Sequence, residues 1–175
     1  METAERIKAA REVVQSVIPF FEENFSKVES HWKRDDTRVT AADLAISKRI
    51  GEFLSVAFPQ DDFCSEEDLP ALGEPARALR SRFAWVLDPI DGTNNFARGI
   101  PLCAVSLALL ENGFPVFGIL YDHAQRVILE GGKNVPLSRD GVPAKTNNPD
   151  YDRHSIISFH FPLKKDEMRS RSFSG

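Results

Sequence analysis

The stretch Trp85-Val86-Leu87-Asp88-Pro89-Ile90-Asp91-Gly92-Thr93-Asn94-Asn95-Phe96 joins a strand pattern, a pair of carboxylates and a turn in one short segment. Its first residues continue an apolar run that starts at Phe83, and such a run is typical of a buried strand. Pro89 fixes its own φ and biases Asp88 toward extended backbone, so a helix cannot begin there. We therefore expect Asp88 and Asp91 to lie at the carboxyl edge of this strand.

The residues after the second carboxylate favour a phosphate-binding turn. Gly92-Thr93-Asn94 has the composition of the entry to a helix or helical turn, whose first N–H groups have no partner within the helix. Such N–H groups form a natural site for an anion. Carboxylate oxygens are the ligands that hard cations such as Mg²⁺ prefer. The combination predicts metal-assisted phosphate chemistry.

The segment from Asp88 to Phe96, Asp-Pro-Ile-Asp-Gly-Thr-Asn-Asn-Phe, resembles the signature of the inositol monophosphatase family. This family lies within the lithium-sensitive, Mg²⁺-dependent phosphatase superfamily that includes fructose-1,6-bisphosphatases. The motif is long and chemically unusual, which makes it far more specific than a lone glycine pattern. Val39-Thr40-Ala41-Ala42-Asp43 and Cys64-Ser65-Glu66-Glu67 resemble further family motifs in order and spacing. The similarity extends from near residue 6 to about residue 160.

The resemblance implies a site for two Mg²⁺ ions. Position by position, Glu66 corresponds to a ligand of the first ion and Asp91 to a ligand of the second. Asp88 would lie between the two ions, and the carbonyl of Ile90 would be a further ligand. Mg²⁺ keeps several waters and is usually held by one or two carboxylates plus substrate phosphate, which suits this set.

The resemblance also assigns the catalytic roles. Thr93 would hydrogen-bond the attacking water while Asp43 accepts a hydrogen bond from its hydroxyl, and Glu66 would accept the proton of the water. The backbone amides of Gly92 and Thr93 would bind the phosphate oxygens. No histidine or cysteine nucleophile is required, so direct attack by water is expected.

The resulting expectation is a Mg²⁺-dependent phosphomonoesterase that hydrolyses a small sugar or polyol phosphate of the inositol monophosphate type. Asn94-Asn95-Phe96 is closer to the inositol phosphatases than to the branch that acts on nucleotide bisphosphates. Fructose-1,6-bisphosphate is the alternative substrate. Family members continue through a second α/β portion with a Trp-Asp motif, and nothing after residue 160 matches it. A truncated, non-catalytic member that acts as an interaction or assembly piece is therefore a second hypothesis.

Composition is ordinary for a globular protein, with 42% hydrophobic and 27% charged residues in a chain of 175. The net charge of -4 gives no reason to expect nucleic acid or an acidic membrane surface as a partner. Residues 1–6 lack the apolar block of a signal peptide, and the longest apolar run, residues 104–110, is too short to span a bilayer. We expect a cytoplasmic protein, and the resemblance implies a homodimer. Cys64 and Cys103 are interpreted as small buried hydrophobes rather than a disulfide.

Two amphipathic helices are expected in the first third of the chain. Residues 2 to about 28 carry apolar side chains at helical spacing, and Pro19 is expected to kink or split this helix. Residues 31–38 favour a loop or β-hairpin. Thr40 and Asp43 form a capping-box pattern at the start of the second helix, which ends at Phe58-Pro59.

Short strands are expected after the helices. Glu111-Asn112-Gly113 predicts a hairpin turn between strands at 102–110 and 114–121. His123 is interpreted as a turn residue without a partner, leading into a third antiparallel strand at 126–129. The remaining expectations are a strand at 62–65, an excursion at 68–82 that is helical at 75–80, a glycine-containing loop at 131–141, and a strand at 155–159.

Together these elements predict an α/β (α+β) layered sandwich of the inositol monophosphatase/fructose-1,6-bisphosphatase type. Two N-terminal helices would pack on a largely antiparallel sheet. Residues 1–160 would form the N-terminal α/β portion of the family domain, and residues 161–175 a polar, disordered tail. The C-terminal half of the family fold is expected to be absent.

Overall fold

The computed structural model describes residues 2–28, 30–32, 38–68 and 79–145, and they belong to one compact unit. The strand expected at 155–159 and the tail at 161–175 lie outside the described residues. So does the helical turn expected at 75–80, except for residues 79 and 80, which have no regular structure.

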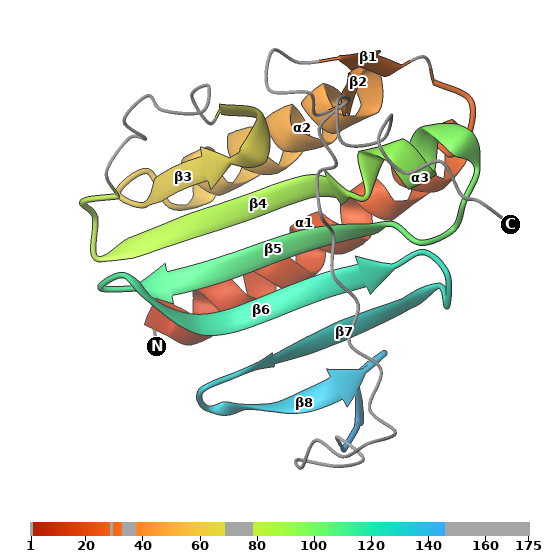
Figure 1. Ribbon diagram of the computed structural model, residues 1–175. Helices are drawn as coiled ribbons and strands as arrows, with labels where there is room; N and C mark the ends of the chain where they lie inside the picture. Colours follow the sequence, from red (N-terminus) through yellow and green to blue (C-terminus); the bar gives the residue numbers. More distant parts are fainter. Residues whose placement is uncertain (1, 29, 33–37, 69–78, 146–175) are drawn as a thin grey trace, which may run out of the picture. The chain divides into compact units, whose positions relative to one another are not determined.

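The described chain contains long helices, one short helix, one 3₁₀ turn and a seven-stranded sheet (Figure 1). The helices are α1 (Glu2–Asn24), α2 (Ala41–Ala57) and α3 (Thr93–Arg98), and the 3₁₀ turn is η1 (Glu66–Asp68). Strands β1 (Ser30–Trp32) and β2 (Arg38–Thr40) form a separate antiparallel pair. The main sheet has the order β3 (Asp62–Ser65), β4 (Phe83–Asp91), β5 (Ala104–Glu111), β6 (Phe114–Asp122), β7 (Val127–Gly132), β8 (Val135–Arg139) and β9 (Val142–Pro143).

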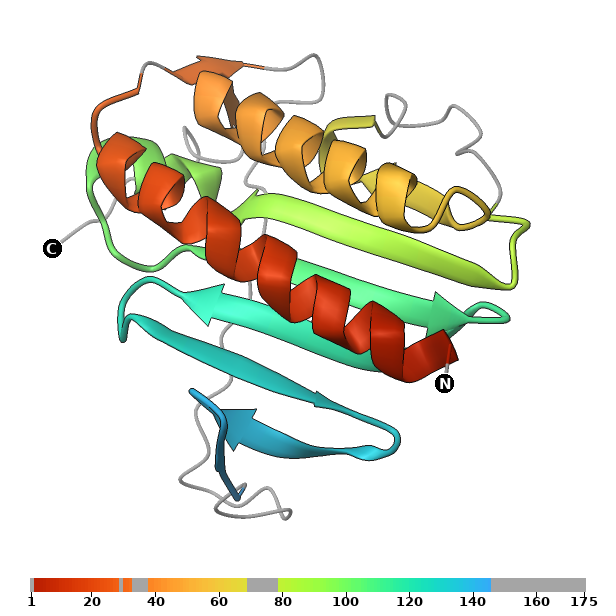
Figure 2. The same cartoon turned by 180° about the vertical axis from the view of Figure 1, so that it is seen from behind.

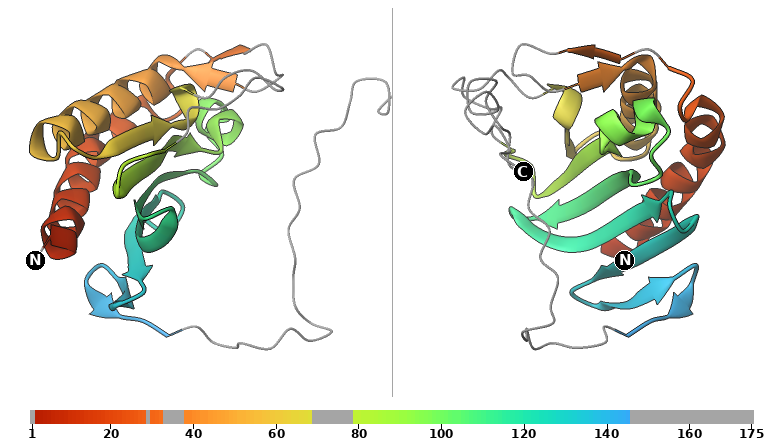
Figure 3. Two further views of the ribbon diagram at one scale, coloured as in Figure 1. Left: turned by 90° about the vertical axis from the view of Figure 1, so that its left-hand side faces the viewer. Right: turned by 45° about the vertical axis from the view of Figure 1, so that its right-hand side comes forward.

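Both long helices lie on one face of the sheet, as Figure 2 and the side view in Figure 3 show. Their apolar stripes pack on the inward side chains of the central strands, and this contact forms the hydrophobic core. Buried members of the core include Val14, Val17, Phe21, Ile46, Ile50, Trp85, Leu87, Leu107, Leu109 and Ile119. The expected layered sandwich with two helices on a largely antiparallel sheet is confirmed.

Helix α1 is continuous through Pro19, so of the two expectations for this proline, a kink or a split, the split was wrong. An internal proline costs about 3 kcal/mol or more because it removes a backbone hydrogen bond. Val17 and Phe21, on either side of it, are fully buried against the sheet, and each contributes about 1.5–3 kcal/mol. The helix ends at Asn24, earlier than expected, where the side-chain amide donates to the Phe20 carbonyl oxygen at 2.8 Å.

The predicted start of α2 is confirmed as a capping box. The Thr40 hydroxyl oxygen accepts from the N–H groups of Ala42 and Asp43, and the Asp43 carboxylate accepts from the Thr40 N–H at 2.8 Å. These bonds satisfy N–H groups that would otherwise lack a partner at the helix start. The strand pair β1–β2 confirms the hairpin option for residues 31–38.

Strand β4 extends further than the apolar run predicted. It continues through Pro89 to Asp91, with a register irregularity between Asp88 and Asp91 in its pairing with β5. A bulge accommodates a proline because the missing N–H is not needed in the ladder there. Asp88 and Asp91 therefore lie within the irregular last residues of β4 and not in a loop after the strand.

The antiparallel strands form a longer meander than expected. The β5–β6 hairpin has φ values of 52° at Asn112 and 81° at Gly113, the left-handed pair that an Asn-Gly turn favours. The loop expected at 131–141 was wrong, because residues 131–132 are the end of β7 and residues 135–139 form β8, with turns at 133–134 and 140–141. Ser138 is buried there and donates to Glu130 at 3.2 Å, a pairing across strands that local sequence does not indicate.

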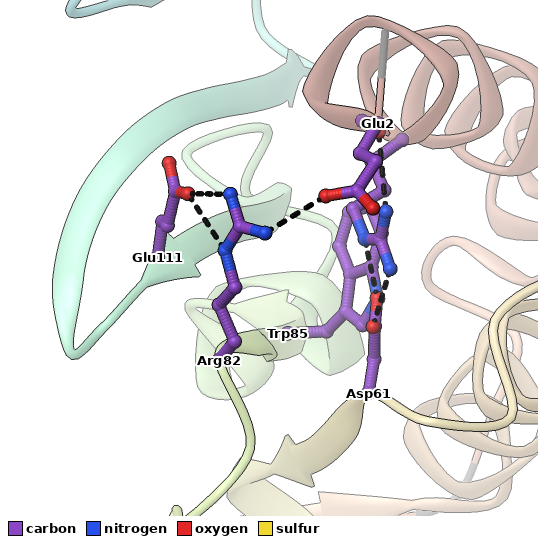
Figure 4. Close-up of polar contacts among 6 residues, drawn as sticks. Glu2, Asp61, Arg82, Trp85 and Glu111 are labelled. Carbon is purple, nitrogen blue, oxygen red and sulfur yellow. Dashed lines mark hydrogen bonds and ion pairs between the residues drawn. The ribbon is translucent and has the colours of Figure 1, made fainter.

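A cluster of ion pairs joins the start of α1 to the amino end of β4 (Figure 4). Asp61 accepts two hydrogen bonds from the Arg6 guanidinium, both at 2.7 Å, and one from Trp85 Nε1 at 3.0 Å. Arg82 bonds Glu111 and Glu2 beside them. The Arg6–Asp61 pair is almost completely buried, so it fixes the position of α1 on the sheet.

Cys103 is buried, as interpreted, whereas Cys64 is only partly buried. Within the described residues, no helix is long and apolar enough to cross a membrane.

Candidate active site

The parallel pairing of β3 with β4 brings the carboxyl ends of both strands to one edge of the sheet. Ser65, the last residue of β3, pairs with Leu87 of β4. The next residue in each strand is an acid, Glu66 at the start of η1 and Asp88 in β4. These acids are therefore neighbours because of the strand register alone.

Asp88 is the most perturbed carboxyl group of this edge. Its Oδ1 atom is buried and has no hydrogen-bond partner among the described residues. Burial, followed by the neighbouring Glu66 and Asp91 carboxylates, raises the pKa of Asp88 to about 8. The backbone hydrogen bond at Ile90 opposes this shift but does not cancel it, so the Asp88 anion is disfavoured. A nearby cation would compensate that charge, so the donor set at Asp88 fits a divalent metal ion.

The acids do not form a complete ligand cage. Glu66 is partly buried and Asp91 is exposed. In the part of the chain that the structure describes, no group of three or more His, Cys, Asp or Glu side chains is arranged so that it could hold a metal ion. The ligand set of Glu66, Asp88, Ile90 and Asp91 therefore stays a prediction.

A second group of predicted residues meets beside these acids. The Thr93 hydroxyl lies 3.1 Å from Asp43 Oδ1 and 3.0 Å from the carbonyl oxygen of Ile90. The hydrogen bond between Thr93 and Asp43 that the resemblance implies is thus present, while its catalytic role stays a prediction. Asp43 is 1% exposed, because the capping box holds its other oxygen on Thr40. Burial raises the pKa of Asp43, although hydrogen bonds from Thr40 and Thr93 oppose that effect.

The turn that follows β4 has the backbone that the sequence predicts. Gly92 adopts φ +83° at the start of α3, and a Cβ at this position would lie 2.7 Å from the Leu102 carbonyl oxygen. Only glycine fits both the left-handed backbone and this close approach. The side-chain amide of Asn95 donates to the same carbonyl at 2.8 Å. The Gly92-Thr93 turn is therefore pressed against residue 102.

The sequence interpretation missed a polar cluster at the same edge. Ala104 pairs with both Asp91 and Asp122, so the β6–β7 turn lies close to the end of β4. In this turn His123 is buried, and its Nδ1 lies 2.7 Å from Glu22 Oε1. The expectation that His123 has no partner was wrong. Glu22 and His123 are 101 positions apart, and the sequence around either residue does not indicate its partner.

A model of the inositol monophosphatase family matches residues 2–172. The chain belongs to this family.

Among curated relatives of the family, the chain is 40% identical over 114 residues to the probable inositol 1-monophosphatase ImpA of Mycobacterium tuberculosis. It is 28% identical over 145 residues to the fructose-1,6-bisphosphatase/inositol-1-monophosphatase of Aquifex aeolicus. These matches cover 63% and 81% of this chain but only 38% and 53% of the relatives. The chain thus spans about half the length of the curated relatives it matches, or less.

The fold is also that of solved family structures. The inositol monophosphatase TM1415 of Thermotoga maritima superposes with a TM-score of 0.72 at 22% identity, over 83% of this chain and 55% of that one. At this identity the similarity shows the fold alone. This shared fold agrees with the fold expected from the sequence and with the architecture described above.

Proposed function

We propose that the chain acts as a Mg²⁺-dependent phosphomonoesterase on a small sugar or polyol phosphate of the inositol monophosphate type. The observation that carries the proposal is the buried Asp88 oxygen without a partner, next to Glu66 and in the same short segment as the Thr93–Asp43 hydrogen bond. The Asp88 carboxyl group is hydrogen-bonded with Glu66 and with the Ile90 backbone, yet its Oδ1 has no donor in the described part of the chain, whereas Arg6 donates to both oxygens of Asp61.

Two Mg²⁺ ions would be held by Glu66, Asp88, Asp91 and the carbonyl of Ile90. When bound, such ions neutralise phosphate charge and lower the pKa of water. The acids that repel one another in the described structure would then all be ionised. Asp88, whose pKa is raised to about 8 by burial and by the neighbouring Glu66 and Asp91 carboxylates, is the residue that would lie between the two ions.

The remaining chemistry belongs to side chains of the protein. If the Thr93 hydroxyl donates its proton to Asp43, its oxygen lone pairs are left to accept a hydrogen bond from water and orient it. Glu66 accepts the proton of that water as its oxygen bonds to phosphorus, and the ester P–O bond breaks. The amides of Gly92 and Thr93 would stabilise the charge on the phosphate oxygens.

The substrate class rests on the family membership and on the relatives. Both relatives named above carry inositol monophosphatase in their names, and one of them also carries fructose-1,6-bisphosphatase. Inositol monophosphate is therefore the first candidate and fructose-1,6-bisphosphate the alternative. The second candidate function is a non-catalytic interaction or assembly piece that retains the acids named above.

Phosphate release from inositol 1-phosphate and from fructose-1,6-bisphosphate tests the proposal, with Mg²⁺ titrated in the presence and absence of Li⁺. We expect Mg²⁺-dependent release that Li⁺ inhibits and that the Asp91→Asn variant lacks. Glu52→Gln is the matched control, since Glu52 is an exposed acid on α2 far along the chain from the motif. Activity that survives Asp91→Asn would refute the metal assignment. An intact chain that is silent at every Mg²⁺ concentration would refute the phosphatase and leave the non-catalytic function.

A further inference from the structure

A pair formed by the partly exposed Glu22 and the buried His123 joins the last turn of α1 to the turn between β6 and β7. Glu22 Oε1 accepts hydrogen bonds from the Tyr121 hydroxyl and from His123 Nδ1, the latter at 2.7 Å. His123 is 5% exposed, and its ring lies 4.1 Å from the ring of Phe25. Burying this much polarity is unfavourable unless the groups satisfy one another, so the pair has one preferred geometry.

Each of the two segments is also connected to α3. At the end of α1, the rings of Phe21 and Phe25 pack against the buried ring of Phe96, with ring centroids 4.8 and 5.7 Å apart. The N–H of Ser26 also donates to the Phe96 carbonyl oxygen at 3.1 Å. The end of α1 is therefore bonded to the backbone of α3 as well as packed against it.

The β6–β7 turn reaches α3 through the segment before β5. The backbone N–H of His123 donates to the Cys103 carbonyl oxygen at 3.2 Å. The preceding carbonyl, that of Leu102, accepts from Asn95 and lies against Gly92. His123 is thus bonded to Glu22 through its side chain and to the Leu102-Cys103 segment through its backbone.

Helix α3 spans only residues Thr93–Arg98, and a helix of this length cannot maintain its own geometry. We propose that Glu22 and His123 are positioning residues, which hold the Gly92-Thr93 turn in place by locking the two segments that clamp α3. The inference rests on the proposed function in one respect, namely that the Gly92 and Thr93 amides bind the phosphate and that the Thr93 hydroxyl orients the water. The clamp itself does not depend on it.

The charged and titratable groups around the pair are consistent with an ionised acid. From β6 and its following turn these groups are Tyr121, Asp122 and Arg126, and Cys103 faces the pair from the segment before β5. Burial works to raise the pKa of Glu22, but hydrogen bonds from Tyr121 and His123, and the charges of His123 and Arg126, lower it overall. An ionised Glu22 accepts charge-assisted hydrogen bonds, which are the stronger kind.

Amide hydrogen exchange on the full chain tests the clamp without any need for activity. The reporters are the N–H groups of Asn95, Phe96 and Ile100, which are bonded within or next to α3. In Glu22→Gln we expect these amides to exchange about tenfold faster, since the amide oxygen still accepts the hydrogen bonds but they lose their charge assistance. Tyr121→Phe, which removes one hydroxyl and folds readily, should give a smaller increase at the same amides.

Arg11→Gln is the matched control, because Arg11 also ties α1 to the sheet through an ion pair, with Glu130 at 2.7 Å. It contacts neither α3 nor its clamp, so exchange at the reporter amides should stay within about twofold of the intact chain. Equal acceleration in Arg11→Gln and Glu22→Gln would show a global loss of stability and overturn the inference. Unchanged exchange in Glu22→Gln and Tyr121→Phe would overturn it as well.

Kinetics then separate positioning from mere stability. At a temperature where both variants are folded, KM for inositol 1-phosphate and the inhibition constant of inorganic phosphate should rise about tenfold in Glu22→Gln and not in Arg11→Gln. Unchanged constants together with faster exchange would refute the link to phosphate binding. An inactive intact chain refutes the proposed function instead, and the exchange result still decides whether the clamp exists.

Discussion

Replacing Asp88 by Asn should stabilise the metal-free protein while removing its response to Mg²⁺. Asp88 combines a buried oxygen without a partner with two neighbouring carboxylates. An amide of nearly the same shape carries no charge, and its NH₂ group can donate to Glu66. The substitution therefore relieves repulsion instead of creating a cavity.

The size of the effect follows from the pKa of Asp88, which rises from 3.8 to about 8 on folding. Placing such a group in a site where it is still protonated at pH 7 costs at most about 4 kcal/mol, at about 1.4 kcal/mol per pH unit. Asp88 is partly exposed, so solvent screening reduces the cost, and we expect a gain of about 1–3 kcal/mol in the Asp88→Asn variant.

The sign of the pH dependence is fixed by the same shift. A group whose pKa is raised on folding favours the folded state below its unfolded pKa, and this contribution is lost as pH rises through the folded pKa. The intact chain should therefore lose stability relative to Asp88→Asn between about pH 4 and about pH 8. Above that range the difference should be constant.

Urea unfolding in EDTA at pH 5, 7 and 9, repeated with excess Mg²⁺, provides the measurement. Mg²⁺ at a hundred times its Kd should stabilise the intact chain by about 2.7 kcal/mol and leave Asp88→Asn unchanged. Asp91→Asn is the companion variant, because Asp91 is exposed; it should lose the Mg²⁺ effect with little change in EDTA. A less stable Asp88→Asn variant in EDTA, or a stability difference that does not vary with pH, would contradict the reasoning.

Three further outcomes are expected. Arg6→Ala should cost about 3–5 kcal/mol in urea unfolding because it leaves the Asp61 carboxylate buried without its cation, and a loss below 1 kcal/mol would show that the pair is dispensable. Gly92→Ala should cost about 1–3 kcal/mol, since its Cβ would meet the Leu102 carbonyl and its φ is positive; wild-type stability would contradict the close approach. Thr93→Ala should lower kcat for inositol 1-phosphate about a hundredfold or more while Thr93→Ser retains most of it, and equal rates in the two would exclude the hydroxyl from the reaction.

Local chemistry made much of the fold predictable from the sequence. The Thr40–Asp43 capping box, the Asn112-Gly113 hairpin and the helical turn after Gly92 all depend on residues within a few positions of one another. The acids at the end of β4 were predictable for the same reason. Their neighbour Glu66 came from the resemblance, because β3 and β4 pair across a long connection.

Apart from the strand β8, which was expected to be a loop, the errors concern interactions between distant residues. Pro19 stays inside a helix because buried side chains on either side of it contact the sheet, which the helix sequence does not show. The partner of His123 lies on a helix at the other end of the described chain. The Arg6–Asp61 pair, for which the sequence provided no expectation, also joins distant residues, 55 positions apart.

The parallel pairing of β3 with β4 has a consequence for the order in which this protein folds. The hairpins from β5 to β8 close short loops and can form early, whereas the β3–β4 pair and the Thr93–Asp43 bond, which spans 50 residues, must wait for much longer loops to close. The sheet edge with Glu66 and Asp88, which we propose as the Mg²⁺ site, is then among the last parts to form. A refolding chain would regain its circular dichroism before it could take up Mg²⁺, and nascent molecules would pass through a compact but chemically inert stage.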